Sequence, residues 1–73
     1  MTYREIFNMK YRQGISTTEL VKRFPGDIKR ISEVALLEVS DEMLRQVISE
    51  AEIVERLIHL KKRYGILAKH ENV

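Results

Sequence analysis

The strongest constraint on the fold is a helix-capping signal that recurs along the chain at helix-sized intervals. Thr2 and Ser16 each stand three residues before a glutamate. This is the capping-box pattern, in which the hydroxyl accepts from a first-turn N–H and the carboxylate reaches back to the cap. Ser49 has the same spacing to Glu52, and Ser40 precedes two acids that complement the positive end of a helix dipole. The sequence therefore predicts an all-α fold.

Glycine and proline mark the expected ends of the first helices. Gly14 suits the left-handed conformation that follows a last helical turn. Pro25-Gly26 ends the next helix, because proline removes an amide donor and glycine permits a turn. Asp27 follows as the expected cap of the third helix. The first three helices are expected at residues 3–13, 17–24 and 28–38.

The C-terminal part leaves two arrangements open. Residues 41–64 form either one long helix or two shorter helices that meet near Ser49. The cap signal at Ser49, with Ile48 and Ile53 placed as a hydrophobic staple, favours a break there. We expect Gly65 to end the last helix and residues 68–73 to form a flexible tail.

The size and composition of the chain favour self-association. Its 73 residues make one domain near the lower limit for independent folding. It has no cysteine, so neither a disulfide nor a thiolate metal site adds stability. Because oligomerisation is the remaining common way to bury more surface, we expect a homodimer. The apolar share of 44% and the charged share of 33% are typical of a folded domain.

The sequence carries no targeting or catalytic signal that we recognise. No apolar run approaches the roughly 18 residues that cross a bilayer, and the N-terminus has charges where a secretory signal needs an apolar core. His59 and His70 have no second ligand at metal-binding spacing. The glycines mark helix ends and not a phosphate loop. We expect a cytoplasmic protein that is not an enzyme and has no metal, cofactor or membrane partner.

Charge is distributed in three blocks. Residues 1–30 contain seven Lys or Arg and three acids, residues 31–55 contain one Arg and seven acids, and residues 56–73 contain five bases and one acid. A basic N-terminal third is where a nucleic-acid-binding surface would lie, although solvated helix faces of mixed sign give the same counts.

The stretch 14–34, G-I-S-T-T-E-L-V-K-R-F-P-G-D-I-K-R-I-S-E-V, has the form of two short amphipathic helices joined by a turn. Its spacing resembles the helix-turn-helix segments of resolvases, transposases and sigma-factor DNA-binding regions. It differs from them at the Pro25-Gly26 turn, where glycine comes one place late, and at Val21, where they prefer alanine. The residues that carry the resemblance are Gly14, Ser16, Glu19, Leu20, Val21, Phe24, Ile31 and Val34.

The resemblance implies a three-helix helix-turn-helix core followed by one long or two shorter C-terminal helices. The domain would span residues 1–67, with the helix-turn-helix unit in 1–38 and dimerisation helices in 40–67. The implied function is sequence-specific binding of double-stranded DNA by a small dimeric transcriptional regulator.

The DNA contacts are expected mainly at the start of the third helix. Lys29 and Arg30 open it, and an arginine there can make the paired hydrogen bonds that read guanine. Glu33, one turn along the same face, either accepts from cytosine or is a solvated acid. Basic residues around the motif are candidate phosphate contacts or plain surface residues: Lys22, Arg23, Lys10 and Arg12.

Two apolar seams run along the C-terminal helical region. One seam contains Leu44, Val47, Ala51, Val54 and Ile58, and the other contains Ile53, Leu57, Leu60, Tyr64 and Leu67. Together they are wider than a small three-helix core needs. We predict a dimer interface at Ile53, Leu57, Leu60 and Tyr64; the alternative is that this helix is buried in the core of its own monomer.

Two other functions fit parts of the sequence. A helical protein–protein interaction module, such as a small inhibitor or adaptor, would use the Ile53, Leu57 and Leu60 face and the acidic middle block. A lesser alternative is a ribbon-helix-helix DNA binder. Residues 34–39 look somewhat like its strand, and residues 40–44 look like the start of its first helix.

Overall fold

The structure, a computed structural model, describes residues 1–71 and the side chains of residues 1–63. Within this part of the chain the fold is all-helical, as predicted, and has no strand. The elements in chain order are α1 (Tyr3–Phe7), a π-helical turn η1 (Asn8–Arg12), α2 (Thr17–Arg23), a 3-10 turn η2 (Pro25–Asp27), α3 (Ile28–Ala35), α4 (Asp41–Leu44) and α5 (Glu50–Glu71).

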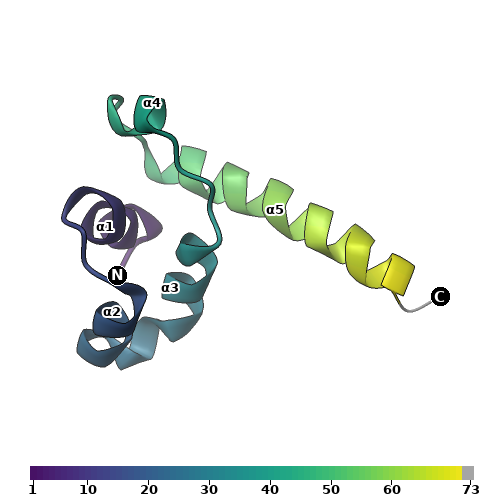
Figure 1. Cartoon of the computed structure of the whole chain (residues 1–73), viewed down its shortest axis with the longest axis horizontal. Coiled ribbons are helices and arrows are strands. Elements are labelled where there is room, and N and C mark those ends of the chain that lie inside the picture. Colours follow the sequence, from purple (N-terminus) through teal and green to yellow (C-terminus); the bar gives the residue numbers. More distant parts are fainter. Residues whose placement is uncertain (72–73) are drawn as a thin grey trace.

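The helices form a small body from which the last helix projects (Figure 1). α1, α2 and α3 gather at one end, where α3 packs on both α1 and α2. α5 begins beside α4, passes α1 and then extends well beyond the body. The elongated outline, 41 × 28 × 18 Å, follows from this projection.

The predicted capping signals are confirmed at four helix starts. Thr2 forms a complete capping box with Glu5. The hydroxyls of Ser16 and Ser40 each accept from the backbone N–H three residues on, in both cases at 3.2 Å. Ser49 accepts from the N–H of Glu52 at 3.2 Å, and α5 begins directly after it. The break near Ser49 is therefore present, and α4 and α5 are separate helices.

Gly14 has the positive φ, 72°, that was expected after the first helical segment. The ends of α3 and α5 differ from the prediction. α3 ends at Ala35 and not near residue 38. At this end the Val34 carbonyl accepts from the Leu37 amide at 3.1 Å and from the Tyr11 hydroxyl at 2.9 Å. The same hydroxyl lies 3.2 Å from the Leu37 carbonyl oxygen, so Tyr11 helps to satisfy the carbonyls at the helix end.

The end predicted for the last helix at Gly65 is wrong, because α5 continues to Glu71. A glycine inside a helix costs only about 1 kcal/mol relative to alanine, so it does not compel an end. The predicted tail, residues 68–73, thus includes helical residues up to 71; residues 72 and 73 lie outside the described part. The ribbon-helix-helix interpretation is also wrong, because residues 34–39 form the end of α3 and an irregular link.

Buried side chains from α1, α2, α3 and α5 and from the link before α5 make one core. Ile53 and Leu57 of α5 belong to it, with 0% and 4% of their surface exposed. The prediction that they face a second copy is therefore wrong: they are buried in the monomer. Leu60 is partly buried against the same core, and the Tyr64 side chain lies outside the described part. The core residues are Ile6, Phe7, Leu20, Ile31, Val34, Ile48, Ile53 and Leu57.

Candidate nucleic-acid interface

The unit formed by α2, η2 and α3 is a pair of helices joined by a single 3-10 turn. The Phe24 amide still bonds to the Leu20 carbonyl at 2.8 Å, and the Asp27 amide bonds to the Phe24 carbonyl at 3.0 Å. α3 then begins at Ile28 without an intervening loop. Because Leu20, on α2, and Ile31, on α3, are fully buried, the unit is held against the core by its inner sides.

Lys29 and Ser32 lie on the exposed side of α3. They are three residues apart, which places them on neighbouring turns of one face. Both side chains are exposed, and neither has a salt bridge or side-chain hydrogen bond within the described residues. Sequence reasoning named Lys29 and missed Ser32, although its spacing from Lys29 was a usable signal. Their polar groups are available to a ligand that approaches α3 from outside.

Arg30 is held at the edge of this face. Its guanidinium pairs with the Asp27 carboxylate at 3.4 Å and lies 5.7 Å from the centre of the Tyr3 ring. The side chain is nevertheless half exposed, at 50%. A guanidinium has five N–H donors, so these contacts orient Arg30 and leave donors for a further partner.

Lys22 and Arg23 lie near the end of α2 and are exposed. Arg23 pairs with Glu19 of the preceding turn at 3.0 Å. An exposed pair of this kind contributes at most about 1 kcal/mol, so an incoming phosphate can replace the carboxylate. Among the described residues Lys22 has no such partner.

Arg12 and Lys10, which were predicted as phosphate contacts, both make hydrogen bonds within the chain. The Arg12 guanidinium donates to the carbonyl oxygens of Leu44 at 2.7 Å and Gln46 at 2.6 Å, and so ties η1 to the end of α4. The Lys10 ammonium donates to the Thr17 hydroxyl at 2.8 Å. Both side chains are engaged within the chain, and their role is to hold its segments together.

Glu33 does not face outward, as the prediction of a base contact required. Only 12% of its side chain is exposed. Its carboxylate accepts from the Tyr3 hydroxyl at 3.2 and 3.3 Å and pairs with Lys61 of α5 at 2.8 Å. Burial opposes ionisation of Glu33, but the Lys61 ammonium and the Tyr3 hydroxyl outweigh it and lower the pKa of the carboxyl. Glu33 is a link between α1, α3 and α5.

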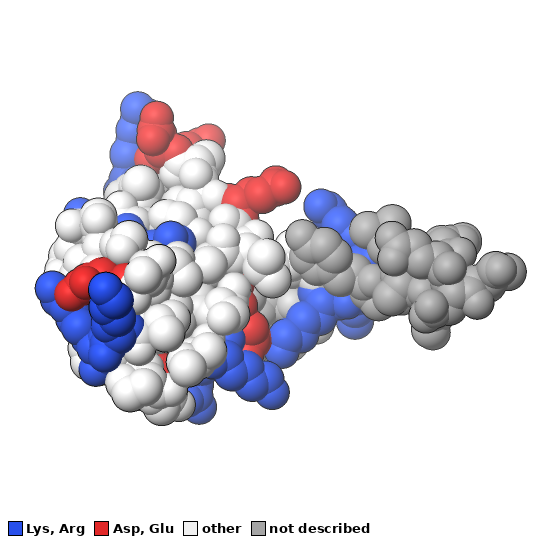
Figure 2. All heavy atoms as spheres, turned by 60° about the horizontal axis from the view of Figure 1, so that its bottom comes forward, with Lys and Arg blue, Asp and Glu red and all other residues white. Residues whose placement is uncertain are grey.

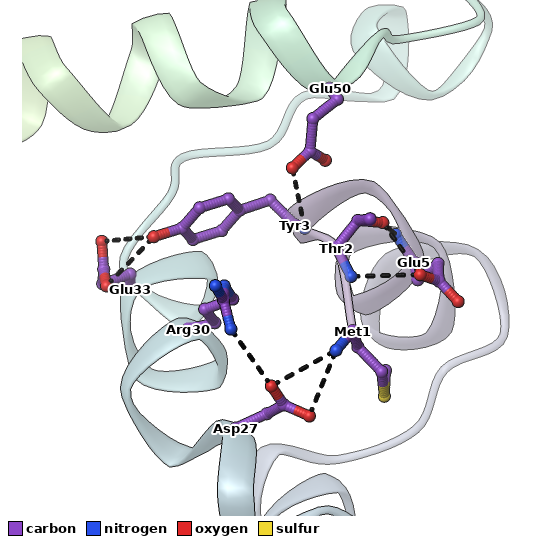
Figure 3. A network of polar contacts seen from close by, with 8 residues as sticks. All are labelled: Met1, Thr2, Tyr3, Glu5, Asp27, Arg30, Glu33 and Glu50. Atoms are coloured by element: carbon purple, nitrogen blue, oxygen red, sulfur yellow. Dashed lines mark hydrogen bonds and ion pairs between the residues drawn. The ribbon is translucent and has the colours of Figure 1, made fainter.

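A network of polar contacts fixes the start of α3 to the start of α1 (Figure 3). The Met1 amine lies 3.4 Å from the Asp27 carboxylate, which also holds Arg30. With its carboxylate engaged in this way, Asp27 makes no capping hydrogen bond to α3. Glu50, the first residue of α5, accepts from the amide of Tyr3 at 3.2 Å. Lys29 and Arg30 therefore lie at the start of a helix that these contacts hold against α1.

Glu50 supplies a long-range cap that sequence reasoning missed. Its second carboxylate oxygen accepts from the Arg4 amide at 2.6 Å. Together with the Thr2–Glu5 box, this leaves none of the first amides of α1 without an acceptor. No local sequence pattern signals it, because Glu50 is far from α1 along the chain.

Lys and Arg side chains do not form one continuous patch on the side of α2 and α3. Figure 2 shows them in separate groups toward the edges of this face, with a broad uncharged surface between them. Red acidic atoms adjoin several of the blue groups. A ligand on this side would therefore meet several separate positive groups and not one continuous basic surface.

The described residues hold no cluster of three or more His, Cys, Asp or Glu side chains fit for a metal ion. None of the helices in this part of the chain combines the length and hydrophobicity that a membrane span requires. Comparison with known proteins matches the chain to no family model, no curated protein and no solved structure. Its function is therefore inferred from its own residues.

Proposed function

We propose that the chain is a small cytoplasmic regulator that binds double-stranded DNA and acts by occupying its site, without catalysis. The observation that carries this proposal is the braced α2–η2–α3 unit, whose inner side is buried and whose outer side keeps Lys29 and Ser32 accessible. A helix presented in this way fits the major groove, which is about 12 Å wide.

In this mode the first turns of α3 contact the DNA. Lys29 and Arg30 donate to base edges or to the nearest phosphates, and the Ser32 hydroxyl donates or accepts at a base edge. Lys22 and Arg23 on α2 contact a phosphate strand. The division of the cations into groups is compatible with such a ligand, because the phosphates of the two strands lie on either side of the groove.

The experiment is a salt series of binding to random-sequence duplex DNA. For the unchanged chain, affinity should fall steeply as salt rises, because each neutralised phosphate releases a counterion. Lys29→Gln and Lys22→Gln should each reduce the slope of log K against log salt by about 1. Arg45→Gln is the control, since Arg45 is exposed but lies outside the α2–α3 unit. Binding that is undetectable at low salt, or equal slopes for all variants, would contradict the proposal.

A second candidate function, a helical protein–protein interaction module, is favoured by a specific observation. A groove between the link after α3 and α5 is lined by two leucines and by more basic than acidic side chains, since Arg56 and Arg63 outnumber Glu38. An acidic amphipathic segment would fit it by charge and hydrophobicity. Arg56→Glu and Arg63→Glu would weaken such binding and leave duplex binding by α3 unchanged. The groove is lined by Leu37, Glu38, Arg56, His59, Leu60 and Arg63.

A further inference from the structure

Of the two apolar seams of the C-terminal region, one is buried in the structure and the other is exposed. The inner seam, Ile53, Leu57 and Leu60, packs in or against the core of the monomer. The other seam remains at the surface of α5: Ala51 is exposed, Val54 is partly exposed, and Ile58 is 49% exposed. We call Ala51, Val54 and Ile58 the outer seam.

Val47, in the link before α5, is a further exposed apolar residue, with 82% of its surface accessible. Scattered apolar residues on a surface need no explanation, but Ala51, Val54 and Ile58 recur at steps of three and four along one side of α5. α5 also extends past the body, which leaves part of its length without a neighbouring helix (Figure 1). The outer seam lies on a side of α5 that the core does not cover, and an aligned apolar strip of this kind is suited to packing against another helix.

The distribution of charges along α5 favours pairing with a second copy of the same helix in antiparallel orientation. Among the charges of α5 that are not engaged with other helices of the monomer, the acids Glu52 and Glu55 lie in the first part of the helix and the bases Arg56, Lys62 and Arg63 follow. A second copy of α5 in parallel orientation would place acids beside acids and bases beside bases. In antiparallel orientation, the acidic part of each copy lies beside the basic part of the other.

Glu55 and Lys62 give this pairing a defined register. They are seven residues, or two helical turns, apart and so lie on the same side of α5. Ile58 is between them on the neighbouring outer seam. If Ile58 lies near the two-fold axis, Glu55 of one copy faces the partner's Lys62, and the same contact is repeated by symmetry.

We propose that the chain forms a homodimer through the outer seams of two antiparallel α5 helices, with Ile58 near the two-fold axis. The interface differs from the Ile53 and Leu57 surface expected from the sequence. It does not depend on DNA binding, since it uses none of the residues assigned to the DNA. Dimerisation and DNA binding are measured separately, so the failure of one leaves the other standing.

The first test is analytical ultracentrifugation of the whole chain over a range of concentrations, without DNA. The unchanged chain should show a concentration-dependent dimer. Ile58→Asp should raise the dimer dissociation constant at least about 100-fold, because a symmetric interface carries the change twice. Leu36→Asp is the matched control, since Leu36 is 53% exposed but lies outside α5. A chain that is monomeric at all concentrations, or a dimer that Ile58→Asp leaves intact, would overturn the proposal.

The second test concerns direction. Glu55→Lys or Lys62→Glu alone should each weaken an antiparallel dimer, because like charges then face each other at both symmetric contacts. The double variant E55K/K62E should restore it, because both contacts again join opposite charges. Single variants that dimerise as well as the unchanged chain, or a double variant that is as weak as the singles, would contradict the antiparallel arrangement.

Discussion

α3 and α5 are both amphipathic, and both bury one side in the same core, but they expose different chemistry. α3 contributes Ile31 and Val34 to the core and presents a basic and polar side that starts at Lys29. α5 contributes Ile53 and Leu57 and presents an apolar strip with charges along it. A charged face suits a polyanion, whereas an apolar strip suits another helix. One small core can therefore support two surfaces with different partners.

The largest predicted effect separates the two seams of α5. Ile53→Ala should lower the free energy of unfolding by about 2–5 kcal/mol, because it leaves a cavity in the core. Ile58→Ala should lower it by less than about 0.5 kcal/mol, because Ile58 is at the surface of the monomer. Chemical denaturation at a concentration where the chain is monomeric measures both values. Equal losses would mean that the inner and outer seams are wrongly assigned.

The next prediction distinguishes a basic residue that stabilises the fold, Arg12, from one on the exposed face of α3, Lys29. Arg12→Gln should lower the free energy of unfolding by about 1–2 kcal/mol, because the carbonyls of Leu44 and Gln46 lose a charged donor. DNA affinity per folded molecule should be unchanged. Lys29→Gln should do the reverse, weakening DNA binding without affecting stability. Denaturation and low-salt binding on the same samples test this; a loss of affinity in folded Arg12→Gln would count against it.

The cap that α5 supplies to α1 should contribute about 1 kcal/mol. Glu50→Ala removes the acceptor of the Tyr3 and Arg4 amides, and losing an N-terminal cap typically costs this much. Glu52→Ala is the matched control, because Glu52 is an exposed acid in the same turn of α5. Thermal unfolding of the two variants should give the lower midpoint for Glu50→Ala. Matching midpoints would show that α1 does not depend on Glu50.

The smallest predicted effect is a pH dependence of the free energy of unfolding, which arises from the contact of Glu33 on α3 with Lys61 on α5. The pKa of Glu33 is lowered in the folded chain, so its stabilising contribution is present above the ordinary value of 4.5 and is lost as pH falls through the lowered pKa. Glu33→Gln should reduce the acid dependence of stability by less than about 1 kcal/mol, since Lys61 is largely exposed. Denaturation at pH 7 and pH 3 measures it. An unchanged difference between the two pH values would refute the link.

The starts of the helices could be predicted because capping is local. Ser16, Ser40 and Ser49 need only residues within one turn, and the structure uses all three as expected. Glu33 and Arg12 could not be placed from the sequence, because their partners are distant along the chain. The prediction that Ile53 and Leu57 face a second copy was wrong for a similar reason, because the sequence does not show which seam of α5 the core covers. That choice depends on where α1 packs, which periodicity alone does not reveal.

The most direct test of the α3 face is a titration of the ¹⁵N-labelled chain with a short duplex at low salt, followed by amide chemical shifts. We predict the largest changes at Lys22, Lys29 and Ser32, and little change at the outer-seam residues Ala51 and Ile58. Shifts confined to α5, or no shifts at any duplex concentration, would contradict the account that α3 carries the DNA-binding surface.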